Sequence, residues 1–163
     1  MSRIDWTSFT VRIPVRASMK KLYSAWTRAS ELEEWFLRKA VYTGVDKKPI
    51  RRAASIAKGC AFQWEWYGYD GVEKGVVKEA NGRDHVRFTF ANSLVNVRLR
   101  QVGKEVVVEL VQSGIPTDPA SKKNIRLGCH VGWTFWMANL KSVYEGGVNL
   151  RNTNEELTGM VNN

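Results

Sequence analysis

Apolar and polar residues alternate along several stretches of the chain, a pattern typical of β-strands with one buried face. The first stretch covers residues 9–15 and places its apolar side chains on one face: Phe9, Val11, Ile13 and Val15. Pro14 has no backbone N–H to donate, so we expect this strand at an edge of its sheet or Pro14 near the strand's end.

The middle of the chain predicts a series of further strands. Loops or turn residues separate alternating stretches at residues 41–45, 62–66, 72–80, 86–90, 95–99 and 106–110. We expect a turn at Tyr69-Asp70-Gly71, and Asn81-Gly82 is a strong signal for a two-residue hairpin. Gly75 predicts a β-bulge inside the stretch 72–80. Consecutive hairpins of this kind form an antiparallel meander with one face in solvent.

Two short helices are predicted directly after the first strand. Ser18 is a suitable N-cap for a helix that runs to Thr27. Ser30 begins the second helix, and Glu33 three residues later completes a capping box. The apolar spacing within both segments predicts that one face of each helix is buried.

A long helix is predicted over residues 120–145, after the N-cap signal Asp118-Pro119. Gly128 and Gly132 lie in its interior, where each costs about 1 kcal/mol relative to Ala. We expect these glycines to allow a close approach of the helix backbone to the sheet. The residues on its apolar face are Ile125, Cys129, Gly132, Phe135, Trp136, Asn139, Leu140 and Val143.

These elements predict an α+β fold with one domain over residues 1–163. The apolar face of a curved sheet needs a cover, and a helix of about 26 residues spans nearly 40 Å, which is enough to cross a sheet. We therefore expect a curved antiparallel sheet, with two short helices after its first strand, wrapped around the long C-terminal helix. The segment after about residue 152 lacks aromatic residues, and we expect it to be flexible.

Aromatic residues are the unusual part of the composition, because the 163-residue chain has seven Trp, five Tyr and six Phe. Large rings of this kind either fill a core or line an apolar ligand cavity. A cavity between sheet and helix would be lined by Phe62, Trp64, Trp66, Phe88, Phe90, Val97, Leu99, Gly128, Gly132, Phe135, Trp136 and Asn139. A dense aromatic core is the other interpretation.

The formal net charge is +9, and much of it lies in residues 38–58, where seven Lys or Arg accompany one acidic residue, Asp46. We expect an exposed basic loop that attracts anionic groups. Arg51 and Arg52 are candidates to bind the anionic end of a ligand at the cavity mouth, and the loop is a candidate docking site for an acidic protein. Nucleic acid is not expected, because the aromatic residues follow an inward-facing periodicity and no known binding motif occurs.

No group of residues predicts a cofactor, a metal site or a catalytic set. His85 and His130 are far apart, and Cys60 and Cys129 have no metal-binding spacing. No nucleophile motif and no phosphate-binding loop occurs, so we expect no enzymatic activity. The first ten residues lack a signal-peptide core, and no apolar run is long enough to span a membrane. We therefore expect a cytoplasmic protein with free thiols and no membrane insertion.

Several segments resemble the START-like superfamily, also called helix-grip or SRPBCC, which includes the birch-pollen allergen and polyketide cyclases. The closer resemblance is to bacterial homologues of the activator of the heat-shock chaperone ATPase. It extends from about residue 7 to 151 and rests on LYSAW at 22–26, WF at 35–36, FQWEW at 62–66, EANG at 79–82, GWTF at 132–135, NLK at 139–141 and GGVNLR at 146–151. The resemblance implies a cavity that often holds a hydrophobic ligand, without a shared catalytic set. Asn149 stands where many relatives carry Asp.

Three functions follow as hypotheses. The first is a non-enzymatic binding module that holds a hydrophobic small molecule, a lipid or an aromatic acid, between sheet and helix. The second is a chaperone-linked or stress-related interaction domain that docks an acidic partner through the basic loop. The third, a cyclase- or dehydratase-like enzyme, has the least support because no acid–base pair is evident.

Overall fold

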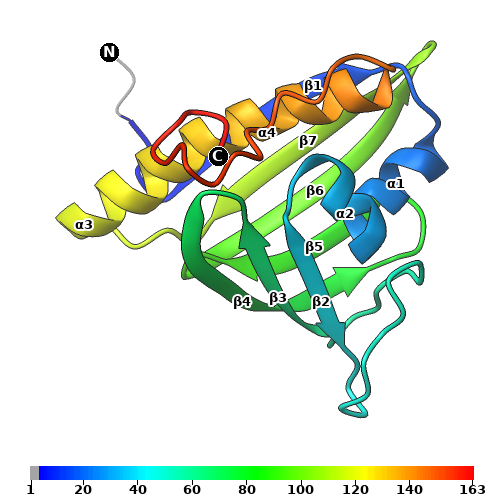
Figure 1. Ribbon diagram of the computed structural model, residues 1–163, viewed down its shortest axis with the longest axis horizontal. Helices are drawn as coiled ribbons and strands as arrows, with labels where there is room; N and C mark the ends of the chain where they lie inside the picture. Colours follow the sequence, from blue (N-terminus) through cyan, green and yellow to red (C-terminus); the bar gives the residue numbers. More distant parts are fainter. Residues whose placement is uncertain (1–3) are drawn as a thin grey trace.

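One antiparallel sheet curves around a long helix in the computed structural model, which describes residues 4–163 (Figure 1). The first three residues of the segment inspected for a signal peptide lie outside this range. The strands within it are β1 (Ser8–Val15), β2 (Lys39–Thr43), β3 (Ala61–Trp66), β4 (Tyr69–Ala80), β5 (His85–Phe90), β6 (Ser93–Val102) and β7 (Glu105–Ser113). Their order in the sheet is β1-β7-β6-β5-β4-β3-β2.

The helices lie where the sequence predicts them. Between β1 and β2 the chain forms α1 (Met19–Thr27) and α2 (Ala29–Trp35). After β7 it forms α3 (Pro119–Ser121), a π-helical segment η1 (Lys122–Leu127) and α4 (Gly128–Tyr144), which follow one another as one long helix (Figure 1). The predicted α+β helix-grip architecture is therefore confirmed.

β1 forms one edge of the sheet, in agreement with the position of Pro14. The strand pairs with β7, and Pro14 lies opposite Val107. Phe9 and Val15, near its two ends, are buried. An edge strand tolerates the missing N–H of proline, because a residue there has a partner strand on one side only.

The two short helices confirm one predicted cap and contradict the other. The Ser18 side chain accepts a hydrogen bond from the backbone N–H of Lys21 at 3.2 Å, as expected of an N-cap. The prediction of a capping box is wrong, because α2 begins directly after α1 and Ser30 lies inside the first turn of α2. The Glu33 carboxylate instead accepts from the backbone N–H of Ala40 at 2.9 Å, which ties α2 to β2.

Two predicted turns differ in the structure. The chain reverses between β3 and β4 at Tyr67-Gly68, where Gly68 has φ +63°, and Tyr69 already belongs to β4. A positive φ is easily adopted by glycine, which explains why the reversal occurs there. The loop between β4 and β5 covers residues 81–84 and is longer than a two-residue hairpin. The Asn81 side chain holds it by accepting from the backbone N–H groups of residues 83–85, each at 3.0 Å.

Gly75 lies in a regular part of β4, so the predicted bulge at this position is wrong. The residue pairs directly with Phe62. A Cβ on Gly75 would lie 2.3 Å from Cζ of the Phe62 ring, which shows how closely this ring approaches the strand. The register shift of β4 against β5 occurs further along, between Val77 and Glu79.

The interior glycines of the long helix do not contact the sheet. A Cβ on Gly132 would meet nothing within 4 Å, and one on Gly128 would have the backbone oxygen of Lys123 as its neighbour at 3.6 Å. The expected close approach of helix backbone and sheet at these positions is therefore wrong. The buried residues of α4 are Trp133, Trp136, Met137, Asn139, Leu140 and Tyr144.

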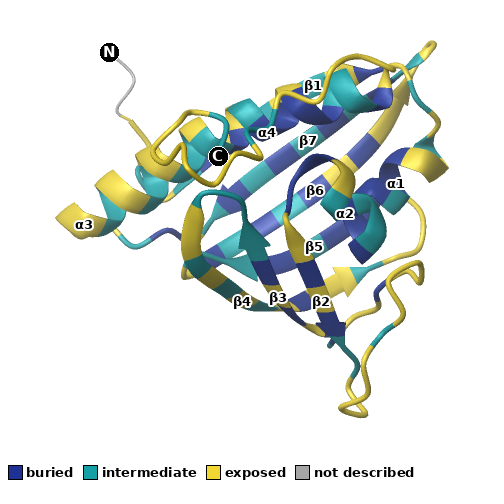
Figure 2. Ribbon diagram, viewed as in Figure 1, coloured by how far each residue is buried: buried dark blue, intermediate teal, exposed yellow. Residues whose placement is uncertain are grey.

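Many of the buried residues, whose positions are dark blue in Figure 2, are aromatic. Trp26, Trp35, Trp64 and Trp133 are each no more than 2% exposed. The Trp35 ring packs edge-on against Trp26 with centroids 4.9 Å apart, and its Nε1 donates to the carbonyl of Ala25 at 3.0 Å. Part of the unusual aromatic content therefore has a packing role.

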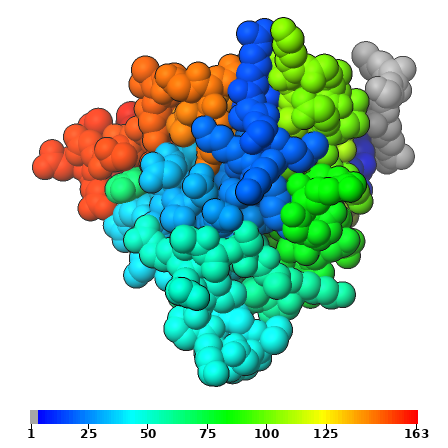
Figure 3. Space-filling view, turned by 90° about the vertical axis from the view of Figure 1, so that its right-hand side faces the viewer, coloured from blue at the N-terminus to red at the C-terminus, as the bar shows by residue number. Residues whose placement is uncertain are grey.

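Two segments lie outside the sheet and its helices. Residues 44–60 form the basic loop, which projects from the end of β2 (Figure 1 and Figure 3). Residues 148–163 run back past α2, and the Arg151 guanidinium donates to the carbonyls of Glu33, Glu34 and Leu37. The flexibility expected after residue 152 stays a prediction.

Candidate functional site

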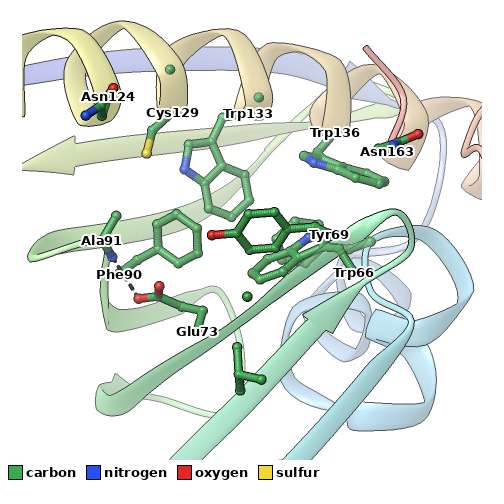
Figure 4. Close-up of a pocket in the computed structure, with 15 residues that line it drawn as sticks. Trp66, Tyr69, Glu73, Phe90, Ala91, Asn124, Cys129, Trp133, Trp136 and Asn163 are labelled. Atoms are coloured by element: carbon green, nitrogen blue, oxygen red, sulfur yellow. Dashed lines mark hydrogen bonds between the residues drawn. The ribbon is translucent and has the colours of Figure 1, made fainter. Parts of the chain in front are cut away.

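A pocket of about 460 Å³ opens between the long helix and the β3–β4 hairpin (Figure 4). The helix contributes Asn124, Gly128, Cys129, Gly132, Trp133 and Trp136. The sheet contributes Trp66, Tyr69, Gly71, Val72, Glu73, Phe90 and Ala91, and Phe36 and Asn163 complete the lining. Pockets that hold small organic molecules have volumes of about 300–1,000 Å³.

The two interior glycines of the long helix, Gly128 and Gly132, provide the room on the helix side. A spacing of four residues places Gly128 and Gly132 on the same face of the helix. The large rings of Trp133 and Trp136 stand beside this face and point towards the sheet (Figure 4). Because the glycines have no side chains, the space between these rings and the β3–β4 hairpin stays open.

The β3–β4 hairpin supplies the opposite wall. Its register shifts between Glu65 and Trp66, and Trp66 pairs with Tyr69 beside the turn. The rings of Trp66 and Tyr69 meet edge-on with centroids 6.2 Å apart. Tyr69 is 63% exposed and forms the outer rim of the pocket, while Trp66 is half-buried.

Phe36 and Phe90 hold the rings of the pocket in place. Phe36 is 2% exposed and packs edge-on against Trp66 and Trp136, with centroids 5.5 and 5.3 Å apart. Phe90 lies 5.2 Å from Trp133 and 6.3 Å from Trp66 between ring centroids. Aromatic pairs at these distances are mutually stabilising and prefer tilted or edge-on orientations. The walls of the pocket are therefore held in position by contacts within the protein.

Glu73 has the one charged side chain among the described residues that line the pocket. It lies on the face of β4 that also bears Gly75 and the buried Val77. One carboxylate oxygen accepts from the backbone N–H of Ala91 at 2.8 Å. Ala91 and Asn92 form the turn between β5 and β6 with φ of 46° and 54°, the combination found in type I′ hairpins. The hydrogen bond fixes the carboxylate at the sheet end of the pocket (Figure 4).

A chain of hydrogen bonds joins the helix wall to the sheet wall. Nε1 of Trp133 donates to Oε1 of Gln112 at 2.9 Å, and Nε2 of Gln112 donates to Oγ of Ser93 at 2.8 Å. The Ser93 hydroxyl in turn donates to the carbonyl of Phe90 at 2.7 Å. Buried polar groups that are fully paired in this way restrict a side chain to one orientation. The position of the Trp133 ring is thus set by polar contacts as well as by packing.

Cys129 places a thiol at the pocket, but burial raises its pKa above the ordinary value of 9.0. A thiol with a raised pKa stays protonated near neutral pH and is a weak nucleophile. Cys60 is buried elsewhere, and both cysteines are free. Within residues 4–163 no three or more potential ligands are placed to hold a metal ion. None of the helices in that range is both long and apolar enough to cross a membrane.

The structure divides the residues that the sequence predicted for a cavity into two main groups. Five of them line the pocket: Trp66, Phe90, Gly128, Gly132 and Trp136. Five others are packed in the core, with 6% or less of their surface exposed: Phe62, Trp64, Phe88, Val97 and Leu99. Alternation along a strand identifies the inward face, but it does not indicate which end of that face remains uncovered.

Asn139 does not line the pocket but connects α4 to neighbouring segments through hydrogen bonds. Its Nδ2 donates to the carbonyl of Trp35 at 2.6 Å, and its Oδ1 accepts from the backbone N–H of Leu150 at 2.7 Å. The side chain is fully buried and joins α2, α4 and the segment after α4. Its polar atoms are engaged within the protein rather than turned towards the pocket.

The remaining predicted residues lie outside the lining. Phe135 packs edge-on against Trp136 with centroids 4.9 Å apart. Arg51 and Arg52 belong to the basic loop, and Arg52 forms an ion pair with Glu33 of α2. The structure does not bring either arginine to this pocket, so a contact of these residues with a ligand stays a prediction.

Sequence reasoning missed several lining residues, of which Trp133, Tyr69 and Glu73 matter most. The π-helical segment η1 interrupts the regular period of 3.6 residues, so a helix face that begins at Ile125 and is continued into α4 misses Trp133. Tyr69 was assigned to a turn that lies two residues earlier. Strand alternation places Glu73 on the same face as Val77 and could have identified it, although acidic residues are rarely buried.

The sheet, the long helix and the pocket between them define a helix-grip protein with an aromatic-lined pocket of ligand size. The chain belongs to the family of activator of Hsp90 ATPase homolog 1-like proteins, whose model matches residues 16–145. A comparison with curated protein sequences finds no match.

Solved structures of low sequence identity share the fold. A protein from Staphylococcus saprophyticus has a TM-score of 0.69 at 14% identity, with 88% of this chain and 96% of that chain covered. The Aha1 dimer from Colwellia psychrerythraea has a TM-score of 0.67 at 17% identity, with 86% and 97% covered. DynU16, a protein of the dynemicin biosynthetic locus, has a TM-score of 0.68 at 18% identity, with 90% of this chain but 50% of DynU16 covered.

Proposed function

We propose that this protein is a non-enzymatic binding module that holds a hydrophobic small molecule in the pocket between α4 and the β3–β4 hairpin. The observation that carries the proposal is the open space beside Gly132, in a chain whose aromatic residues otherwise pack tightly. A Cβ there would meet nothing within 4 Å, although the position faces a wall of rings. Apolar walls with a few fixed polar groups are the usual composition of a small-molecule site.

The polar groups at the pocket favour binding over catalysis. The Cys129 thiol has a raised pKa, and the Glu73 carboxylate is held by the backbone of Ala91. General acid–base or nucleophilic catalysis needs a reactive group beside a second group that activates it. The similarity to a protein of the dynemicin biosynthetic locus agrees with a role near small-molecule metabolism, and it leaves the ligand of this chain to experiment.

Native mass spectrometry of freshly purified protein tests the proposal. We expect a mass above that of the denatured chain when a ligand is retained. Titration of the empty protein with 3-methylindole should change the Trp fluorescence, because Trp66, Trp133 and Trp136 line the pocket.

A matched pair of variants links any binding to this pocket. Gly132→Leu fills the open space with a good helix former and should weaken binding by at least about ten-fold. Val131→Leu changes the neighbouring side chain, which is 64% exposed, and should leave binding unchanged. Equal affinities of the two variants and the wild type would place the ligand elsewhere and contradict the proposal.

The exposed basic loop supports a second candidate function, the docking of an acidic protein. Lys47, Lys48 and Arg51 are all exposed, and the loop projects from the body of the molecule (Figure 3). The description of the family names an activator of the Hsp90 ATPase, which makes a chaperone one candidate partner. Replacement of these three residues by Glu should abolish a salt-sensitive pulldown. Arg52 is left in place because it pairs with Glu33. Binding that survives the triple substitution would exclude the basic loop as the docking site.

A further inference from the structure

We infer that the pocket selects an aromatic ligand that carries a protonated amine, with the amine directed at Glu73. The inference rests on the proposed function and names the chemical class of its ligand. A ligand with an amine differs from the aromatic acid that the sequence suggested through its basic loop. The carboxylate lies among the rings of the pocket, whereas Arg51 and Arg52 do not line it.

The Glu73 carboxylate retains acceptor capacity for a ligand. A carboxylate has about four acceptor positions, and a single hydrogen bond, from Ala91, is formed within residues 4–163. None of the ion pairs among the described residues involves Glu73. The side chain is half-buried, and its carboxylate faces the space below Cys129 and Phe90 (Figure 4). Its negative charge is thus available to a group bound in the pocket.

The geometry of the β5–β6 turn fixes the position of this charge. Ala91 has a positive φ of 46°, which orients its N–H towards the carboxylate oxygen 2.8 Å away. A non-glycine residue keeps such a conformation where the surrounding structure holds it. A ligand amine would therefore meet an acceptor that is already in place, which reduces the entropic cost of forming a charge-assisted hydrogen bond.

The aromatic walls add to the same selectivity. The faces of Trp and Tyr rings attract cations through their quadrupoles, and desolvation strengthens this attraction. Trp66, Tyr69 and Trp133 surround the region above Glu73 (Figure 4). An anionic group in the same place would face both the negative ring surfaces and the carboxylate. The net charge of +9 attracts anions at a distance, but contacts within a partly desolvated pocket are stronger than long-range fields screened by salt.

Three probes with the same ring test the inference: tryptamine, neutral 3-methylindole and indole-3-acetate, each titrated by calorimetry. We expect tryptamine to bind about ten- to hundred-fold more tightly than indole-3-acetate, the factor that corresponds to a hydrogen bond with a charged group. In Glu73→Gln this ratio should fall below about three-fold, because the affinity for tryptamine falls by more than that for 3-methylindole. The glutamine keeps an oxygen that can accept from Ala91, so the turn is preserved.

A matched variant and defined outcomes separate the inference from the proposed function. Glu79→Gln removes the same charge from the same strand, outside the pocket lining and at an ion pair with His85, and should bind the three probes as the wild type does. If 3-methylindole binds and indole-3-acetate binds as tightly as tryptamine, the inference is overturned while the binding function stands. If Glu73→Gln weakens all three probes equally, the residue supports the pocket and does not select charge, which also overturns the inference. Absence of binding by every probe would overturn both.

Discussion

Gly132→Ala should stabilise the protein, a result opposite to the usual effect of a single substitution. Glycine in a helix interior is less favourable than alanine by about 0.8–1.0 kcal/mol. The new Cβ would meet nothing within 4 Å, so no steric cost offsets this gain. We therefore expect an increase of about 1 kcal/mol in the free energy of unfolding. For a chain of this size that corresponds to a rise in Tm of about 2–4 °C.

Thermal and urea denaturation of Gly132→Ala, Gly75→Ala and the wild type measure this effect with an internal contrast. A Cβ on Gly75 would lie 2.3 Å from Cζ of Phe62, and the Phe62 ring is itself stacked on Trp64 with centroids 4.2 Å apart. The ring cannot move away freely, so we expect Gly75→Ala to destabilise by about 1–3 kcal/mol. The same chemical change should thus have opposite signs at the two positions.

A Tm of Gly132→Ala at or below that of the wild type would refute the reasoning. It would mean that the space beside Gly132 closes in solution, or that the long helix packs against the hairpin there. A rise in Tm together with unchanged affinity for 3-methylindole would show that one methyl group is tolerated in the pocket. Gly132→Leu would then test how much of the volume a ligand needs.

Three further predictions concern Asn139, Tyr144 and Cys129. Asn139→Ala should lower the free energy of unfolding by about 1–3 kcal/mol, because it removes the hydrogen bonds of the buried Asn139 side chain to the carbonyl of Trp35 and the N–H of Leu150; urea denaturation measures this. Burial and the hydrogen bond to Glu31 raise the pKa of Tyr144 above its ordinary value of 10.0. Its contribution to stability is therefore complete below pH 10.0 and is lost as the pH rises further, so ultraviolet absorbance should show its ionisation together with unfolding. Cys129 should react with iodoacetamide more slowly than the same residue in the unfolded chain, and a bound ligand should slow it again, as mass spectrometry of the labelled protein can show.

The sequence predicts the fold because its signals are local and agree with one another. Alternation in residues 9–15 identifies β1, Pro14 indicates its edge position, and the Ser18 cap marks the start of α1. The length of the C-terminal helix then leaves few ways to cover an apolar sheet. Errors arise where a local signal has a competing partner in space. Glu33, which fits a capping box, binds the backbone of β2, and Asn81 spans a longer loop than its dipeptide suggests.

The site was predicted less well, because a pocket is defined by space that side chains leave unfilled. Trp64 and Trp66 have the same residue type and the same parity along β3, yet Trp64 is 1% exposed in the core and Trp66 lines the pocket. The difference comes from the register shift beside Trp66 and from the glycines of α4, which lie more than sixty residues away. No pattern within one segment contains that information.

Features that cost stability gather on the rims of this one pocket. Gly128 and Gly132 weaken the helix on one side, and the π-helical segment η1, itself an infrequent conformation, adjoins them through Asn124. On the other side, Ala91 has a positive φ, a conformation that glycine adopts more readily than alanine. Packing does not require glycine at position 132, since a Cβ there would meet nothing within 4 Å. The common position of these features is explained if the pocket is maintained for a ligand, because strained and unfilled sites tend to persist where function needs them.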